Sequence, residues 1–114
     1  MATSRSPSER DELERGLRLI DEGAYFEAHE VLEDLWRAAA SRERDFFQGL
    51  VHVAVAWHHA GRHNRPGFER QLAKAARRLG PYAPTHRGVD VADLVEQIHA
   101  ASFAALARVK IKRS

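Results

Sequence analysis

Two residues with chemically versatile side chains, His29 and Glu33, lie four positions apart in the segment 23–36. In a helix this spacing places both side chains on one face, about one turn apart. On a helical wheel His29 lies inside an apolar arc centred on Leu32, and Glu33 lies at the edge of that arc. Glu30 lies on the opposite, solvated side. Such a pair can chelate a metal ion, or the carboxylate can fix the tautomer of the imidazole.

A second group of polar side chains interrupts the otherwise apolar segment 41–61. Asp45, Gln48, His52 and His59 follow one another at steps of three, four and seven residues, which places them in one narrow column on a helix. The remaining side chains are apolar over most of the circumference, which is typical of a central helix. The sequence therefore predicts a polar line along the side of a buried helix.

The two groups could form one metal site if their helices face each other. Zinc takes three or four nitrogen or oxygen ligands, so His52 and His59 would complete the set begun by His29 and Glu33. Zinc, manganese and iron are the candidate cofactors. We expect His29 and Glu33 to be mostly buried and to lie within hydrogen-bonding or shared-ligand distance of the column that also contains Gln48.

Two alternatives stay open. A buried hydrogen bond between His29 and Glu33, with Gln48 satisfying a further partner, would fix the register of two helices without any chemistry. If the protein is an enzyme, metal-assisted hydrolysis with one of the pair as base is the reaction class to test.

A different class of function follows from Gly23-x-Tyr25-x-x-Ala28, which is similar to the start of the second helix in a tetratricopeptide repeat. No second copy lies about 34 residues away, so the chain is not a repeat array. A single helix hairpin could still present a groove to a peptide or a second subunit. The metal hypothesis needs a third convergent ligand, whereas the interaction hypothesis needs an exposed apolar or aromatic patch.

Helix start and stop signals divide the chain into about five helices. No segment alternates with period two, so we predict an all-α fold, a compact bundle with antiparallel neighbours and a central apolar third helix. We expect one domain at residues 8–109, a disordered tail at 1–7 and a basic tail at 110–114. The predicted N-caps include Ser8, Ser41, Asn64 and Asp90, and the predicted helices end near Gly23, Ala40, Gly61, Gly80 and Val109.

Composition limits the classes of partner. The 114 residues carry a formal net charge of +2, contain no cysteine and include no apolar run as long as a membrane span. Basic residues gather only between Arg108 and Arg113, where we interpret them as cations that complement a helix C-terminus. We expect a cytoplasmic protein without nucleic-acid or membrane partners, and a homodimer is compatible with the sequence. Serine-nucleophile, phosphate-loop and dinucleotide signatures are absent.

The string His29-x-x-x-Glu33-x-x-Trp36, followed by Phe47-Gln48-Gly49-Leu50 and His59, resembles a small bacterial and archaeal family, domain of unknown function 309. The resemblance extends over roughly residues 10 to 100. It implies a compact multi-helical bundle of unestablished activity, whose motif has been suggested to bind metal.

The resemblance also singles out individual positions. It implies that His29, Glu33 and Trp36 are motif residues. Gln48 and His59 are weaker matches. Position 52 in the family is often glutamine, so His52 departs from the pattern. This imidazole would be either an added ligand or a neutral hydrogen-bonding substitute.

Overall fold

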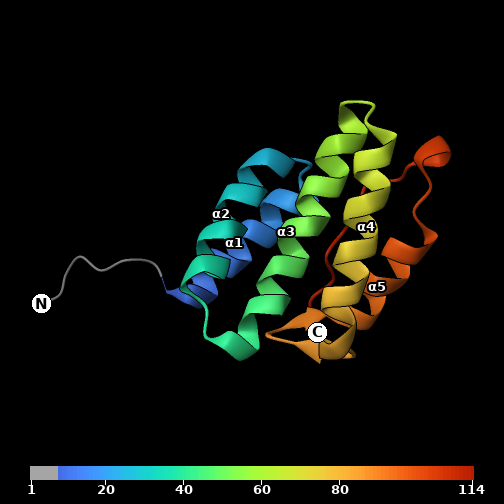
Figure 1. The fold of residues 1–114 in the computed structure, drawn as a ribbon. Helices are drawn as coiled ribbons and strands as arrows, with labels where there is room; N and C mark the ends of the chain where they lie inside the picture. The colour runs from blue at the N-terminus through green and yellow to red at the C-terminus, as the bar shows by residue number, and fades with distance from the viewer. Residues whose placement is uncertain (1–7) are drawn as a thin grey trace, which may run out of the picture.

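The fold is an all-α bundle, as the sequence predicts. The computed structural model describes residues 8–114, and the tail expected at residues 1–7 lies outside this range. The helices are α1 (Glu9–Asp21), α2 (Tyr25–Ala38), α3 (Ser41–Gly61), α4 (Arg65–Leu79) and α5 (Val91–Ala100) (Figure 1). Two 3-10 turns, η1 (Gly80–Tyr82) and η2 (Phe103–Ala105), and two short strands, β1 (Thr85–His86) and β2 (Val89–Asp90), complete the described elements.

Side-chain caps explain where most of these helices begin. The Ser8 hydroxyl accepts a hydrogen bond from the backbone N–H of Asp11, and the equivalent contacts of Asn64 and Asp90 start α4 and α5. These three predicted caps are confirmed. The cap predicted at Ser41 is wrong, because Ser41 is itself the first helical residue and no side chain caps α3.

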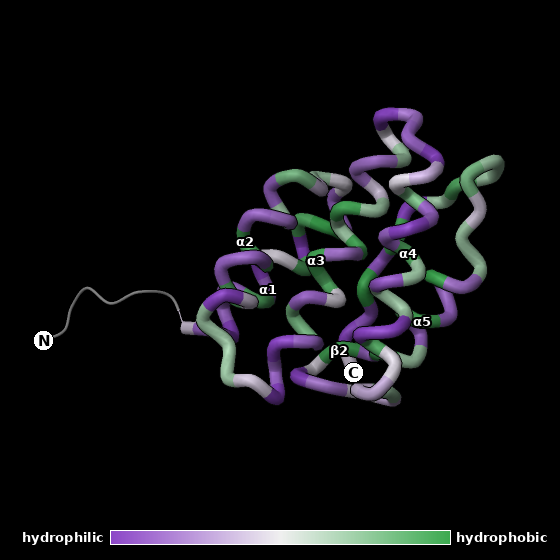
Figure 2. The backbone as a smooth tube through the Cα atoms, viewed as in Figure 1, coloured by the Kyte–Doolittle hydropathy of each residue, from purple (hydrophilic) through white to green (hydrophobic). Residues whose placement is uncertain are grey.

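The helices form two layers around α3. Consecutive helices contact each other from α1 through α5, and α2, α3 and α4 lie side by side while α1 and α5 lie behind them (Figure 1). Hydrophobic residues recur along α3 (Figure 2), and its buried residues point to more than one side, which is expected of the central helix. These buried residues are Phe46, Phe47, Gly49, Leu50, Val51, Val53, Ala54, Ala56, Trp57 and Ala60.

The prediction that the last helix continues to Val109 is wrong. The helix α5 ends at Ala100, and an extended segment, 106–113, returns behind α3 between α1 and α5 (Figure 1). Only 1% of Val109 and 4% of Ile111 is exposed, so alternate residues of this segment complete the core. The residues assigned to a basic tail are therefore packed against the bundle.

Hydrogen bonds join the backbone of this segment to α1 and α3. The indole N–H of Trp57 donates to the carbonyl of Ala107 at 3.0 Å, and the N–H of Ile111 donates to the Asp21 carboxylate at 2.7 Å. Arg108 and Lys110 both donate to the carbonyl oxygen of Asp21, at the C-terminal end of α1. The basic residues thus do complement a helix C-terminus, but that of α1 instead of their own.

The connection between α4 and α5 contains a two-strand antiparallel hairpin. Arg87 and Gly88 at its turn have φ angles of 49° and 79°, as in a tight hairpin turn. The Glu43 carboxylate accepts hydrogen bonds from His86 at 2.8 Å and from Arg87 at 2.5 Å. Burial alone would raise the pKa of Glu43, but these two bonds outweigh it and lower the pKa. The hairpin is thereby fixed to the start of α3.

Candidate functional site

The pair His29 and Glu33 lies at the edge of the core. The Nε2 atom of His29 is 3.7 Å from the Oε1 atom of Glu33, and 27% and 30% of the two side chains are exposed. The same carboxylate oxygen lies 3.3 Å from the guanidinium of Arg37, one turn further along α2. Helical spacing therefore does make the two side chains neighbours, and solvent reaches both of them.

The histidines of the α3 column face α4 instead of α2. The Nδ1 atom of His52 is 2.7 Å from the side-chain oxygen of Gln71 on α4. His59 contacts Asn64, the cap of α4, with 3.3 Å between Nδ1 and the amide nitrogen. Gln48, in the same column, is partly exposed on α3. The rotation of α3 about its own axis therefore separates the column from His29.

This rotation explains why the expected metal site does not form. No group of three or more His, Asp or Glu side chains in residues 8–114 is arranged to hold a metal ion. The set of His29, Glu33, His52 and His59 was predicted on the assumption that the column faces α2, and α3 turns it towards α4. The structure therefore does not support metal binding by these four residues.

A notch opens beside His29 instead. Phe26 and His29 of α2 and Val55 and His58 of α3 line a cavity of about 150 Å³. The ring centroid of Phe26 lies 5.9 Å from that of His29 and 5.8 Å from that of His58. We call these four residues the α2–α3 notch.

Two members of the notch were not assigned a role by the sequence. These are His58 and Val55, both on α3. They lie three positions apart on α3, and Val51 precedes Val55 by four, so all three share one helical face. This spacing, in the helix that follows the motif helix, is the sequence signal that indicates the second wall of the notch.

Burial is the largest influence on the pKa of two α3 histidines, His58 in the notch and His52 on the face towards α4. Burial lowers the pKa of His58, and the positive charges of Arg62, His59 and His29 lower it further. The pKa of His52 is also lowered, mainly by burial, although its bond to Gln71 acts in the opposite direction. Both imidazoles therefore favour the neutral form near neutral pH, which suits an apolar environment.

The third motif residue, Trp36, lies at the other end of α2. It is partly buried and packs against the core, and the guanidinium of Arg44 lies 5.0 Å from the centroid of its ring. A cation over an aromatic face is attracted by the ring quadrupole. Trp36 thus joins the start of α3 to the end of α2 and does not line the notch.

The sequence pattern of a known family covers this region. The family described as "Domain of unknown function (DUF309)" matches residues 13–71, just over half of the chain. The chain belongs to this family. The matched range contains all four residues of the α2–α3 notch and the whole of α2 and α3, so this DUF309 domain carries the notch in its shared segment.

A related protein extends the comparison. The chain is 36% identical over 67 residues to "Uncharacterized protein YpuF" of Bacillus subtilis (strain 168), a match that covers 58% of this chain and 37% of that protein. The chain therefore matches little more than a third of the length of this DUF309 relative. None of the helices described in residues 8–114 has both the length and the apolarity needed to cross a membrane.

Proposed function

We propose that this protein is a binding module whose α2–α3 notch receives one apolar or aromatic group of a ligand. The observation that carries the proposal is Phe26, a large aromatic residue with 56% of its surface exposed at the rim of the notch. Among the described residues only one other large hydrophobic residue is exposed, Leu106, at 37%. An aromatic ring beside an open hollow offers contact area at low conformational cost.

The size and polarity of the notch support this class of ligand. A cavity of about 150 Å³ has room for roughly one benzene-sized group. Phe26 and Val55 supply apolar walls, while His29 and the largely neutral His58 can each exchange a hydrogen bond with a polar atom of the ligand. Pockets that combine apolar walls with a few polar groups are typical of ligand sites.

The same features favour an interaction role over a metal-dependent one. The metal hypothesis requires a third convergent ligand, and no such group lies in residues 8–114. The interaction hypothesis requires an exposed aromatic patch, and Phe26 supports it. We therefore interpret His29 as a wall of a binding notch, with Glu33 as its neighbour one turn further along α2.

The proposal is tested by NMR titration with N-acetyl-phenylalaninamide and N-acetyl-leucinamide as probes. We expect weak, saturable shifts at the side chains of Phe26, His29, Val55 and His58. The Phe26→Ala variant should weaken binding by about fivefold or more, since much of the contact area is lost. Leu106→Ala removes the other exposed hydrophobic side chain and should leave the affinity unchanged.

A parallel titration with zinc distinguishes the metal-dependent alternative. Stoichiometric zinc binding at His29 and His58, with no response to either apolar probe, would overturn the proposal in favour of a metal site. Absence of any response to all three probes would overturn it as well.

A further inference from the structure

Charge is distributed unevenly between the two sides of the bundle. The sequence of α2 contains four acidic residues and one arginine, whereas that of α4 contains five basic residues and one glutamate. These two helices lie on opposite sides of α3 (Figure 1). The molecule therefore has an acidic side and a basic side.

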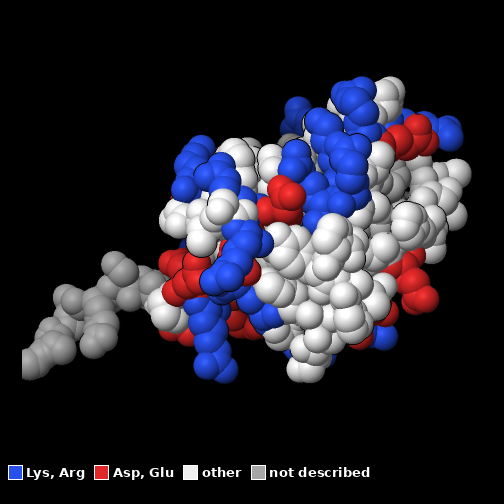
Figure 3. Space-filling view, turned by 60° about the horizontal axis from the view of Figure 1, so that its bottom comes forward, with Lys and Arg blue, Asp and Glu red and all other residues white. Residues whose placement is uncertain are grey.

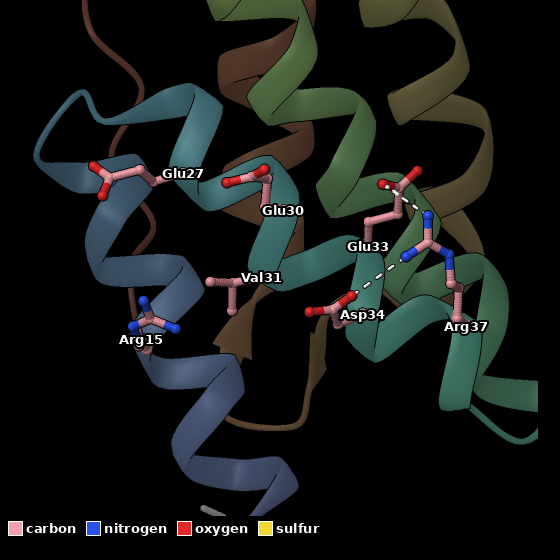
Figure 4. Close-up of a pocket in the computed structure, with 7 residues that line it drawn as sticks. All are labelled: Arg15, Glu27, Glu30, Val31, Glu33, Asp34 and Arg37. Carbon is pink, nitrogen blue, oxygen red and sulfur yellow. Dashed lines mark hydrogen bonds and ion pairs between the residues drawn. The ribbon is translucent and has the colours of Figure 1, made fainter.

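The acidic side is hollowed. Two adjoining cavities of about 500 and 550 Å³ run between α1 and α2 and share Arg15, Val31 and Asp34. Figure 4 shows Glu27, Glu30 and Asp34 on α2 and Arg15 on the neighbouring α1. We call this feature the acidic groove.

The cations of the acidic groove do not neutralise it. Arg15 lies 3.5 Å from the carboxylate of Glu12, and Arg37 lies 3.3 Å from carboxylate oxygens of both Glu33 and Asp34. Both cations are thus paired with carboxylates of the same groove. The lining as a whole still contains more carboxylates than guanidinium groups, so its net charge is negative. The groove therefore attracts a cationic partner.

The basic side carries a matching stripe on α4. Arg65 pairs with Glu69, and Arg78 pairs with Asp45 at 2.7 Å. The other basic residues of α4, Arg70, Lys74 and Arg77, form no ion pair with a carboxylate in residues 8–114. Lys and Arg side chains gather on the upper part of the face shown in Figure 3. We call these three residues the basic stripe.

The spacing of the two charged surfaces is complementary. The basic stripe has steps of four and three residues, and three of the four acids of α2, Asp34, Glu30 and Glu27, have the same steps when α2 is read from its C-terminal end. Both sets extend over seven residue steps, or about 10 Å of helix. Antiparallel alignment would place Arg70 opposite Asp34, Lys74 opposite Glu30 and Arg77 opposite Glu27.

We propose that the acidic groove binds the basic stripe of a second copy of this chain, with the two helices antiparallel. A second copy is the favoured occupant because the chain itself carries both members of the match in the same register. The antiparallel direction also brings opposite ends of the two helix dipoles together. Because the groove and the stripe lie on opposite sides of the bundle (Figure 1), one copy cannot present both to the same partner. The contact is therefore head-to-tail and generates a ring or an open chain instead of a twofold dimer.

The contact is weak and sensitive to salt, since it consists of exposed ion pairs. It uses the side of α2 that faces α1, whereas the notch lies on the side that faces α3. Self-association therefore leaves the notch open. The inference is independent of the proposed function, and the Phe26→Ala variant should associate like the native chain.

The experiment is sedimentation equilibrium of the full chain over a range of concentrations, in about 20 mM and about 500 mM salt. At low salt the mean mass should rise with concentration above the 12.9 kDa of one chain. At high salt it should remain at that value. Circular dichroism checks that each variant described below is folded. We expect them to fold because most of the altered positions are exposed.

Charge reversal tests the pairing itself. The triple variants Arg70→Glu/Lys74→Glu/Arg77→Glu and Glu27→Lys/Glu30→Lys/Asp34→Lys should each be monomeric at low salt. An equimolar mixture of the two should associate again, since each reversed surface then meets its complement. Glu96→Lys, a reversal at an exposed position of α5, is the control and should associate like the native chain.

Several results would overturn the inference. These are a native chain that stays monomeric at low salt, association that survives either triple reversal, and a mixture that fails to restore it. Binding of a synthetic cationic helical peptide in the groove of a native chain that does not self-associate would assign the groove to a different polypeptide and would equally overturn it.

Discussion

The chemistry of His29 depends on which α3 residues lie next to it. Its neighbours are Phe26 and His58, and the histidines expected beside it bond instead to Gln71 and Asn64. Consecutive residues on an ideal helix are rotated by about 100° about the helix axis. The rotation of α3 therefore places Val55 and His58, instead of His52 and His59, beside His29, and this favours a notch over the predicted metal centre.

His52 illustrates a residue whose role is set by burial. Its Nδ1 atom faces Gln71, and its Nε2 atom is buried without a hydrogen-bond partner among the described residues. Burial lowers the pKa of this imidazole, and Lys74, Arg77 and Arg78 lower it further. The lowered pKa favours the neutral form of His52, which shares a hydrogen bond with Gln71.

A prediction about pH follows for this residue. Because the pKa of His52 is lower in the folded state than in the unfolded chain, its contribution to stability is present above about pH 6.5 and is lost as the pH falls through the lowered folded pKa. The native protein should therefore lose more stability than His52→Gln when the pH falls from about 7 to about 5. Urea unfolding at several pH values measures the difference.

The control for this experiment is His99→Gln, which removes an exposed imidazole of α5. It should follow the native profile. Parallel pH profiles for the native protein and His52→Gln would contradict the assignment.

At the scale of elements, the α3–α4 interface depends on one glycine. Gly49 is buried on α3, and a Cβ atom at this position would lie 2.6 Å from Cγ of Leu79, which is fully buried on α4. Contacts this close force a neighbour to move. The small residue on α3 thus permits a close approach of α4 at this point.

We therefore expect Gly49→Ala to destabilise the protein. Overpacking against Leu79 costs about 1–3 kcal/mol, and the gain in helix propensity returns at most about 1 kcal/mol. Thermal or urea unfolding measures the net loss. The matched control is Gly61→Ala, also on α3, where an added Cβ meets no atom within 4 Å. It should be neutral or stabilising, and equal effects at the two positions would refute the packing argument.

At the scale of the whole molecule, the segment 106–113 completes the rear layer. Asp21 at the end of α1 and Gln97 of α5 both hydrogen-bond to it, so it joins two helices that are far apart in sequence. Arg113 reaches Glu14 of α1 and forms an isolated bridge with Val89 of β2. The stability of the bundle therefore depends on its last residues.

Adjacent substitutions in this segment should differ sharply. Ile111→Ala removes a core side chain of which 4% is exposed, and it should cost about 2–5 kcal/mol. Lys112→Ala alters the next residue, whose side chain is 68% exposed, and should change stability by no more than about 0.5 kcal/mol. Urea unfolding checks both values. Similar small losses for the two variants would show that the segment contributes little to folding.

The sequence by itself determined the elements whose signals are local. A cap such as Ser8, Asn64 or Asp90 bonds a backbone N–H three residues away, so it starts a helix wherever that helix is placed. The neighbour relation of His29 and Glu33 is likewise a property of helical spacing alone. These features were predictable from short stretches of chain.

Tertiary structure decided the features that depend on long-range packing. The helical period continues past Ala100, yet Val109 and Ile111 fill the core as an extended segment, which hydrogen bonds to Asp21 of α1 and Gln97 of α5 hold in place. Likewise, His52 and His59 face α4 because packing on both sides of α3 sets its rotation. Residue spacing specifies which side chains share a helical face, but the partner of that face is chosen by the fit of whole surfaces.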